Sequence, residues 1–448
     1  MFANKIINSS RTASVRILTT LLNESENVRN TFQEKEILSK LSNSDKALAH
    51  EIISGTIRWL LKIDWIILQR YKGDFNSAPL IVKNSLRIAI YQILFLDKIP
   101  QSAAVNESVE IIKQYHSLSV SKLVNAVLRD ILRNLNSVTY PDEKSDLPLA
   151  LSVKYSHPRW MVRRWLKRFS VDEVIQIMEA NNERPKISIR VNPIITSTEN
   201  FLDLISRTKI HLSNGYFLKD NFYSEKLSSI ESNTLFKKGF FTIQDEGSAL
   251  CSKLSQAKPG MRVIDLCSAP GGKALNIAGQ MNNKGEIIAV DIYENKLIKI
   301  TQAALRLGVK IIEPVLGDAK SIDIHNADIV FVDAPCSGLG VIRKKQDIKW
   351  MRTSNQINEL VVLQSEILEN AKNLVKPNGH LIYSTCTFEQ QENHEIIKKF
   401  LEINSNFSIE NANNFLPNEV VSNNGFLETY SHKHKIDGTF GVRLRKHD

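Results

Sequence analysis

The pattern of apolar residues changes twice along the 448-residue chain. Over residues 10–135, apolar residues recur every three or four positions, as in Leu86, Ile90 and Leu94. Turn signals at 72–74, 99–100 and 117–121 divide this stretch into about five or six segments of roughly 12–20 residues. The periodicity predicts a helical bundle without a sheet.

A polar, proline-containing stretch follows, which predicts a linker over 139–155. Residues 187–193 then alternate between apolar and polar and end at a proline, which is typical of a strand. A short helix over about 198–207 and a second strand near 239–243 complete a small α+β module over 156–240.

From residue 241 the pattern becomes an alternation of strands and helices. Four short apolar runs, at 263–266, 287–290, 329–332 and 381–383, are separated by helical stretches, which predicts a parallel sheet with helices on both faces. We expect the Asn-rich stretch 404–424 to be a loop. The chain is therefore predicted to be a multidomain protein: an all-α bundle (1–138), a linker (139–155), a small α+β module (156–240) and a Rossmann-like α/β core (241–448).

The net charge of +10 is unevenly distributed. Residues 1–140 contain 18 Lys and Arg against 12 Asp and Glu, residues 141–240 contain 16 against 12, and residues 241–448 contain 24 of each. The stretch 156–169 is the most basic and includes Trp160 and Trp165. This balance favours a polyanion-binding front half, although solvated Lys-rich helices explain it equally well.

Several classes of protein are disfavoured by simple counts. No apolar run approaches the roughly 18–20 residues that span a bilayer, and the N-terminus lacks the pattern of a secretory signal. The four cysteines, at 251, 267, 336 and 386, form no CxxC pair, which disfavours a zinc site and a disulfide framework. We expect a cytoplasmic protein without a membrane partner or a metal, and a monomer because no long apolar heptad repeat is present.

A glycine-containing loop follows the run 263–266. Residues 265–273 read Asp-Leu-Cys-Ser-Ala-Pro-Gly-Gly-Lys and lead into a predicted helix, whose free N–H groups can bind a ligand. Asp291 ends the next strand, where a carboxylate can bind a ribose diol, and Asp318 follows the next apolar run. The pattern indicates a nucleoside-bearing cofactor; a purely structural glycine turn is the alternative.

Two cysteines lie just beyond the ends of predicted parallel strands. Cys336 follows 329–332 within Asp-Ala-Pro-Cys-Ser-Gly (333–338), and Cys386 follows 381–383 within Ser-Thr-Cys-Thr (384–387). Open α/β sheets bind ligands at this edge. A thiolate that adds to C6 of a pyrimidine makes C5 nucleophilic enough to attack an activated methyl group. An acid such as Asp333 can stabilise the charge that develops on the ring.

The motifs at 265–273, 333–338 and 384–387 together resemble those of the Sun family of RNA cytosine-5 methyltransferases. Residues 241–248 and 347–350 also fit that family, and residues 105–109 and 123–129 are similar to NusB-like RNA-binding domains. A NusB-like head on this core is the arrangement of Sun-type bacterial 16S rRNA methyltransferases. The resemblance covers nearly the whole chain; Ser268 and Gln346 stand where alanine and proline are usual.

The resemblance implies S-adenosylmethionine as methyl donor and 16S rRNA as substrate and partner. It implies that Cys386 is the nucleophile, that Cys336 helps to release the product and that Asp333 is shared between the donor and the base. The implied donor contacts are Cys267, Ser268, Ala269, Pro270, Gly271, Gly272, Lys273, Asp291, Asp318 and Asp333. Two alternatives stay open: an amino-group RNA methyltransferase and an RNA-binding antitermination factor.

Overall fold

The computed structural model describes residues 9–23, 36–208, 210–225, 230 and 233–448. Parts of the predicted bundle 1–138 and module 156–240 therefore lie outside the described residues. The chain divides into two compact units, Met1–Met178 and Glu179–Asp448, which are described separately. Within the described ranges, no helix combines the length and the apolar character needed to cross a membrane.

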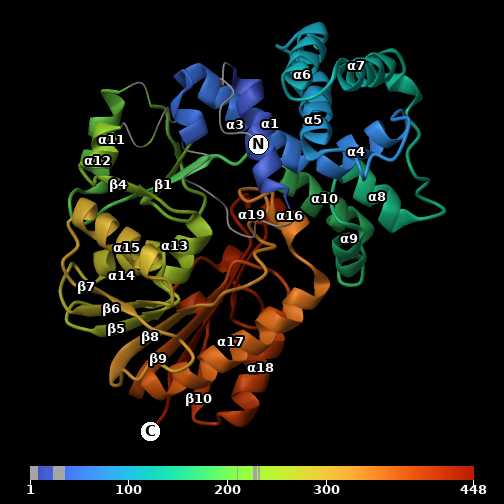
Figure 1. Cartoon of the computed structure of the whole chain (residues 1–448). Helices are drawn as coiled ribbons and strands as arrows, with labels where there is room; N and C mark the ends of the chain where they lie inside the picture. Colours follow the sequence, from blue (N-terminus) through green and yellow to red (C-terminus); the bar gives the residue numbers. More distant parts are fainter. Residues whose placement is uncertain (1–8, 24–35, 209, 226–229, 231–232) are drawn as a thin grey trace. The chain divides into compact units, whose positions relative to one another are not determined.

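The first unit is helical, as the 3.6-residue periodicity predicts. Helix α5 lies at the centre of the bundle and packs against the helices before and after it (Figure 1). Its apolar residues Leu86, Ile88 and Ile90 are fully buried. The bundle helices are α1 (Ser10–Leu21), α3 (Asn43–Arg58), α4 (Leu60–Leu68), α5 (Leu80–Phe95), α6 (Gln101–Tyr115) and α7 (Leu118–Arg133).

Part of the predicted linker is a helix instead. Helix α8 (Leu147–Tyr155) begins at Asp146, whose carboxylate accepts a hydrogen bond from the Leu149 amide. Proline fits the first turn of a helix, so Pro148 marks a helix start here rather than an extended linker. Leu151 is fully buried, which ties this segment to the unit.

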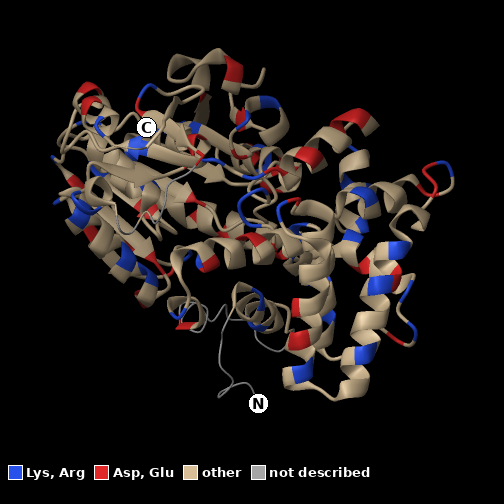
Figure 2. Ribbon diagram, turned by 90° about the horizontal axis from the view of Figure 1, so that it is seen from above, with Lys and Arg blue, Asp and Glu red and all other residues tan. Residues whose placement is uncertain are grey.

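The basic stretch forms α9 (Arg159–Leu166), and α10 (Val171–Asn182) follows. Trp165 is buried and packs edge-on against His157, so it is a core residue. Arg163 and Lys167 are exposed. Figure 2 shows basic and acidic residues interspersed along the ribbons.

The second unit begins with a small antiparallel sheet in the order β2-β3-β1-β4. Helices α11 (Thr198–Ser206) and α12 (Thr234–Lys237) accompany it, and Phe201 and Phe241 lie in its core. The predicted strands correspond to β1 (Ile187–Val191) and β4 (Phe241–Ile243). The pattern missed β2 (Ser213–Asn214) and β3 (Asn221–Ser224), because Asn221 and Ser224 are polar residues buried inside a short strand.

The large sheet has the order β10-β12-β9-β8-β5-β6-β7. The pairs from β9 to β7 are parallel, whereas β12 is antiparallel to both β9 and β10. The sheet is therefore mixed rather than purely parallel. Its strands are β5 (Arg262–Leu266), β6 (Glu286–Asp291), β7 (Ile312–Leu316), β8 (Ala327–Asp333), β9 (Val375–Thr385), β10 (Phe407–Glu410), β11 (Leu427–Thr429), which pairs with β12, and β12 (Thr439–Lys446).

Helices cover both faces of the large sheet, as expected for a doubly wound fold. Residues of α13 (Glu246–Lys253) and α14 (Gly272–Gln280) pack on one face, and residues of α17 (Ser354–Leu374) and α18 (His394–Ile403) pack on the other (Figure 1). Helix α15 (Glu294–Leu307) follows β6. The expected Asn-rich loop 404–424 contains β10 and two short 3₁₀ turns, which corrects that prediction; Phe407 faces the core and anchors the strand.

Candidate active site

The order of the strands in the large sheet indicates where the site lies. From β5 the chain moves to β6 and β7 on one side, and β8 and β9 lie on the other side. The order of the strands therefore reverses between β5 and β8, and ligands of doubly wound proteins bind at the carboxyl ends of the strands at such a point. The loops after β5, β8 and β9 carry all the cysteine-containing motifs that the sequence singles out.

Residues 267–273 form the loop after β5, and main-chain conformation and main-chain hydrogen bonds set its shape. Cys267 has a φ of 60° and Gly271 a φ of 92°, and the Gly271 amide donates to the Ser268 carbonyl at 2.7 Å. A tight turn of this kind favours glycine at 271. Helix α14 starts at the next residue, and its N-cap, Gly271, has no side chain to offer to the first N–H groups. We call residues 267–273 the donor loop.

The buried carboxylate of Asp265, just before the donor loop, indicates whether the site can accept a ligand. Asp265 accepts a hydrogen bond from the Ser268 hydroxyl through Oδ2 at 2.7 Å. Its other oxygen, Oδ1, is buried without a hydrogen-bond partner in the described part of the chain. Burial raises the pKa of Asp265 to about 7, although the Ser268 hydroxyl opposes this. A buried acceptor needs a donor, and a bound ligand with an N–H or O–H group fits that need.

The two further acids lie at the ends of neighbouring strands, as predicted. Asp291 is buried at the end of β6, where its carboxylate accepts from the Ala269 amide at 3.1 Å and the Tyr293 amide at 3.0 Å. Asp318 follows β7 and accepts from the Lys320 amide at 2.9 Å. The Gly317 amide donates to the Asp291 carbonyl at 3.2 Å, which holds the two strand ends together. Each carboxylate oxygen can accept more than one hydrogen bond, so both acids retain capacity for a ligand.

The two cysteines beyond β8 and β9 face each other. The Sγ atoms of Cys336 and Cys386 lie 3.2 Å apart, and the Cys386 amide donates to the Cys336 Sγ at 3.3 Å. Both side chains are partly accessible. The sequence separates them by 50 residues, and the β8–β9 pairing brings them together. We call these two residues the thiol pair.

The surroundings of the thiol pair favour a thiolate at one position. The hydrogen bond with Cys336 lowers the pKa of Cys386; burial and the Asp333 carboxylate oppose this, whereas the cations of Lys273 and Lys345 assist it. The same hydrogen bond, together with burial and the Glu392 carboxylate, raises the pKa of Cys336. Of the two thiols, Cys386 is therefore the one that loses its proton more readily.

Asp333 connects the thiol pair with the donor loop. Its carboxylate forms an ion pair with Lys273, in the first turn of α14, and accepts from the Ser384 hydroxyl at 3.1 Å. Burial acts to lower the pKa of Lys273, but Asp333 outweighs it and raises that pKa. Asp333 is 35% exposed, which leaves it accessible to a ligand, whereas Lys273 is 10% exposed and ties the loop to β8.

Sequence reasoning missed the residues that hold the Cys336 loop. Glu392 accepts from the Ser337 amide at 2.8 Å and from the Ser337 hydroxyl at 2.5 Å. Gln364 donates to Glu392 at 3.0 Å and to the Pro335 carbonyl at 2.9 Å. The available signal was a polar residue on the buried face of α17, because Gln364 lies seven positions from both Ile357 and Ala371.

The other two cysteines lie in different environments. Burial raises the pKa of Cys251 to about 12, and Cys251 is fully enclosed in the core on one side of the sheet. Burial and nearby carboxylates, Asp333 first among them, raise the pKa of Cys267 to about 12. Both therefore remain thiols at neutral pH. Among the described residues, no group of three or more His, Cys, Asp and Glu side chains is arranged to hold a metal ion.

A doubly wound sheet with a ligand-fitting loop after β5 and acids at the end of β6 and after β7 has the arrangement of a Rossmann-like methyltransferase core. Solved structures agree with this fold. A structure named PH0851 aligns with a TM-score of 0.81 and 26% identity over 99% of this chain and 100% of that chain. A methyltransferase homolog protein from Pyrococcus horikoshii aligns with a TM-score of 0.59 and 26% identity over 67% and 99%.

Sequence relatives identify the family. The probable ribosomal RNA small subunit methyltransferase B of Bacillus subtilis is 32% identical over 91% of this chain and 92% of its own length. The ribosomal RNA small subunit methyltransferase B of Yersinia pseudotuberculosis is 31% identical over 82% and 84%. The chain belongs to this family of small subunit rRNA methyltransferases. Family models match three segments: the NusB family at 8–133, the RsmF/B-like ferredoxin-like domain at 157–226, and the 16S rRNA methyltransferase RsmB/F at 253–445.

Proposed function

We propose that the protein transfers a methyl group from S-adenosylmethionine to C5 of a cytosine in 16S rRNA, through a transient bond between Cys386 and C6 of the base. The observation that carries this proposal is the thiol pair. A cysteine with a lowered pKa lies 3.2 Å from a second cysteine with a raised pKa, at the edge of the sheet that also carries the donor loop. Methylation of an exocyclic amino group needs no thiolate.

The chemistry follows from the weak nucleophilicity of C5. The Cys386 thiolate forms a bond to C6, and the C5–C6 double bond shifts its electrons so that C5 becomes enamine-like. C5 would attack the activated methyl group that the bound donor supplies, and the bond between that methyl carbon and the donor's sulfur would break, which releases the demethylated donor. Asp333 hydrogen-bonds the N3/N4 edge of the base by accepting from the N4 amino group, which positions the ring for attack at C6. Its exposed carboxylate and its ion pair with Lys273 support this role.

Product release requires that C5 lose its proton and C6 lose its sulfur. Once Cys386 is bonded to C6, the sulfur contact that raised the pKa of Cys336 is lost, and Cys336 gives its proton to solvent. The Cys336 thiolate, or a water molecule that it holds, then takes the C5 proton; the electron pair of the C–H bond restores the C5–C6 double bond, and Cys386 leaves as a thiolate. The position of Cys336 beside Cys386, with its loop fixed by Glu392, supports this assignment. We assign the donor contacts to residues 267–273, Asp291, Asp318 and Asp333.

The target base must leave its helix or lie in a single strand to reach Cys386. We propose that the helical region 1–138 and the basic module 156–240 bind the rRNA, and that residues 241–448 perform the reaction. The exposed Arg163 on α9 and Lys167, at the C-terminal cap of that helix, support a phosphate-binding role. We also propose a cytoplasmic monomer, and an additional antitermination role for the helical region remains the second candidate function.

Trapping of the covalent intermediate tests the mechanism. With 16S rRNA and S-adenosylmethionine, Cys336→Ala should accumulate a protein–RNA adduct that survives a denaturing gel, because attack occurs and release fails. Cys386→Ala should form none. An adduct in Cys386→Ala, or the absence of an adduct in both variants, contradicts the assignment. A protein that binds rRNA but never modifies it, and whose cellular phenotype survives Cys386→Ala, fits the antitermination alternative.

The salt dependence of RNA binding tests the role of α9. Replacement of Arg163 and Lys167 by glutamine should lower rRNA affinity and reduce the slope of log affinity against log salt by about 1.5, because each lost phosphate contact contributes about 0.7–0.9. Replacement of Lys398 and Lys399, on α18, provides the control. An unchanged slope in the α9 variant contradicts the proposed contact.

A further inference from the structure

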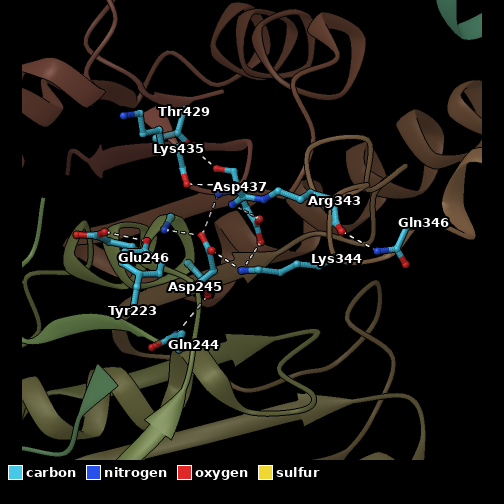
Figure 3. Close-up of polar contacts among 12 residues, drawn as sticks. Tyr223, Gln244, Asp245, Glu246, Arg343, Lys344, Gln346, Thr429, Lys435 and Asp437 are labelled. Carbon is cyan, nitrogen blue, oxygen red and sulfur yellow. Dashed lines mark hydrogen bonds and ion pairs between the residues drawn. The ribbon is translucent and has the colours of Figure 1, made fainter. Parts of the chain in front are cut away.

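A cluster of charged residues in the second unit lies outside the reaction chemistry described above. It contains Asp245, Arg343, Lys344 and Asp437, which we call the ionic bridge (Figure 3). Lys344 forms ion pairs with Asp245 and, at 2.9 Å, with Asp437. Arg343 donates to Asp437 at 3.3 Å and to the Lys435 carbonyl at 3.1 Å. The side chains of both acids are at most 10% exposed, so these contacts are weakly screened by solvent.

The ionic bridge joins three segments that are distant in the sequence. Asp245 precedes α13, Arg343 and Lys344 belong to the loop that begins at Cys336, and Asp437 lies in the turn before β12. The Asp245 carboxylate also accepts a hydrogen bond from the Asp437 amide at 3.2 Å, which fixes Asp245 to the backbone of the C-terminal turn. The loop after Cys336 is therefore held to the C-terminal turn by Lys344 and Arg343.

Backbone contacts lead from this junction to the nucleophile. The Gly438 amide donates to the Gly340 carbonyl at 2.8 Å, and the Gly340 amide donates to the Cys386 carbonyl at 3.0 Å. The contact is so close that a Cβ atom on Gly340 would lie 2.1 Å from the Gly438 oxygen. The position of the Cys386 main chain thus depends on Gly340, and the position of Gly340 depends on the turn that the ionic bridge holds.

The residue before Asp245 contacts the donor loop. Gln244 donates to the Gly272 carbonyl at 3.0 Å, while its own oxygen accepts from Arg190 at 2.6 Å and from Asn276 at 3.2 Å. Two consecutive residues therefore hold the two halves of the site: Gln244 holds the donor loop, and Asp245 holds the loop of the thiol pair through Lys344.

We infer that Lys344 is a positioning residue for methyl transfer: it sets where Cys386 lies relative to the donor loop, through the turn containing Asp437 and through Gly340. This inference rests on the proposed function. Lys344 touches neither thiol in the described contacts; it acts on the segment that holds Cys386. The competing interpretation is that the ionic bridge only stabilises the fold, in which case its loss lowers stability but leaves the reaction of the folded protein unchanged.

The test compares three variants of the full chain. Lys344→Met removes the central cation, Lys344→Arg keeps the charge, and Lys376→Met removes a lysine that pairs with Asp328, at the opposite end of β8, and serves as the matched control. Each variant is measured for folding by circular dichroism, for donor affinity by calorimetry and for single-turnover methyl transfer to 16S rRNA. The rate of adduct formation in a Cys336→Ala background isolates the nucleophilic step.

We expect Lys344→Met to fold and to lose about 10- to 100-fold in single-turnover rate and in adduct formation, because small misplacements of reacting groups have effects of this size. The donor affinity of Lys344→Met should stay within about twofold of that of the parent. Lys344→Arg should recover most of the rate, because it keeps the charge that positions the loop and Lys344 takes no part in the chemistry. Lys376→Met should retain the parental rate.

A folded Lys344→Met protein with the parental rate overturns the inference and leaves the proposed function intact. If the parent itself places no methyl group on C5 of cytosine, the proposed function fails instead. If Lys344→Met does not fold, Lys344→Met/Asp437→Asn restores the charge balance of the cluster, and the same comparison is made with it. A parental rate in that folded double variant overturns the inference; a loss with unchanged donor affinity supports it.

Discussion

The donor loop and the thiol pair occupy the same edge of one sheet, and each contains a cysteine just beyond a buried parallel strand. In the donor loop, Cys267 has a backbone in the left-handed region, and its pKa is raised to about 12. At the thiol pair, the pKa of Cys386 is lowered. Position at a strand end is therefore not enough to make a cysteine reactive.

The difference comes from the neighbours of each sulfur. Cys267 is surrounded by carboxylates, which disfavour a second negative charge. Cys386 receives a hydrogen bond from a second thiol and lies near the cations of Lys273 and Lys345. The backbone geometry of Cys267 shapes the donor loop, whereas the side chain of Cys386 has a lowered pKa, so the two regions should respond differently to the same substitution.

Removal of the thiol gives the largest expected difference. Cys386→Ala should lower methyl transfer to 16S rRNA by at least about 10³-fold, because the covalent route is lost. Cys267→Ala should change the rate by less than about fivefold, since only its backbone shapes the loop. Incorporation of labelled methyl groups into rRNA measures both. Similar losses in the two variants would contradict the division between the regions.

Thiol reactivity gives a second, smaller difference. In the parent protein at neutral pH, iodoacetamide should modify Cys386 on the order of 100-fold faster than Cys267, because the thiolate is the reactive form. The pH midpoint for Cys386 should lie below that of an ordinary cysteine. In Cys336→Ala it should move upward, because the hydrogen bond that lowers the pKa is lost while burial remains. Peptide mass spectrometry of timed reactions measures the rate of modification at each cysteine. An unchanged pH midpoint for Cys386 in Cys336→Ala would refute the claim that Cys336 lowers the pKa of Cys386.

The pH dependence of stability tests the buried acid of the donor loop. Asp265 has a pKa raised to about 7, so its protonated form is favoured on folding. That stabilisation is complete below the unfolded pKa of about 3.9 and is lost as pH rises through about 7. The free energy of unfolding of Asp265→Asn, relative to that of the parent, should therefore rise by about 1 kcal/mol per pH unit between pH 5 and 7. Above pH 7 this difference should change little. Urea unfolding of both proteins at each pH measures this difference. If the free energies of unfolding of the two proteins change with pH in the same way, the raised pKa of Asp265 is ruled out.

Much of the fold follows from periodicity and from strand–loop–helix motifs. The spacing of Leu86, Ile90 and Leu94 predicts a buried helix, and α5 has that form. The runs ending near Leu266 and Val332 predict strands of a parallel α/β sheet, and β5 and β8 pair in parallel. The fold class and the family resemblance are both confirmed. The donor and catalytic assignments remain predictions.

The rest depends on contacts between distant residues, which local patterns do not encode. Asn221 and Ser224 read as loop residues because their burial is decided by neighbouring strands. The antiparallel β12 pairs with β9 across more than 50 intervening residues. Likewise, Gln364 and Lys344 carry no motif of their own, and only the folded chain shows that they hold the loop after Cys336.

The most direct test is the position of the transferred methyl group. Purified protein, S-adenosylmethionine with a labelled methyl group and unmodified 16S rRNA are incubated, and the rRNA is digested to nucleosides for mass spectrometry. The account predicts label in 5-methylcytidine, and none when Cys386→Ala replaces the parent protein. Label on an exocyclic amino group or a ribose, or 5-methylcytidine formed equally well by Cys386→Ala, would contradict it.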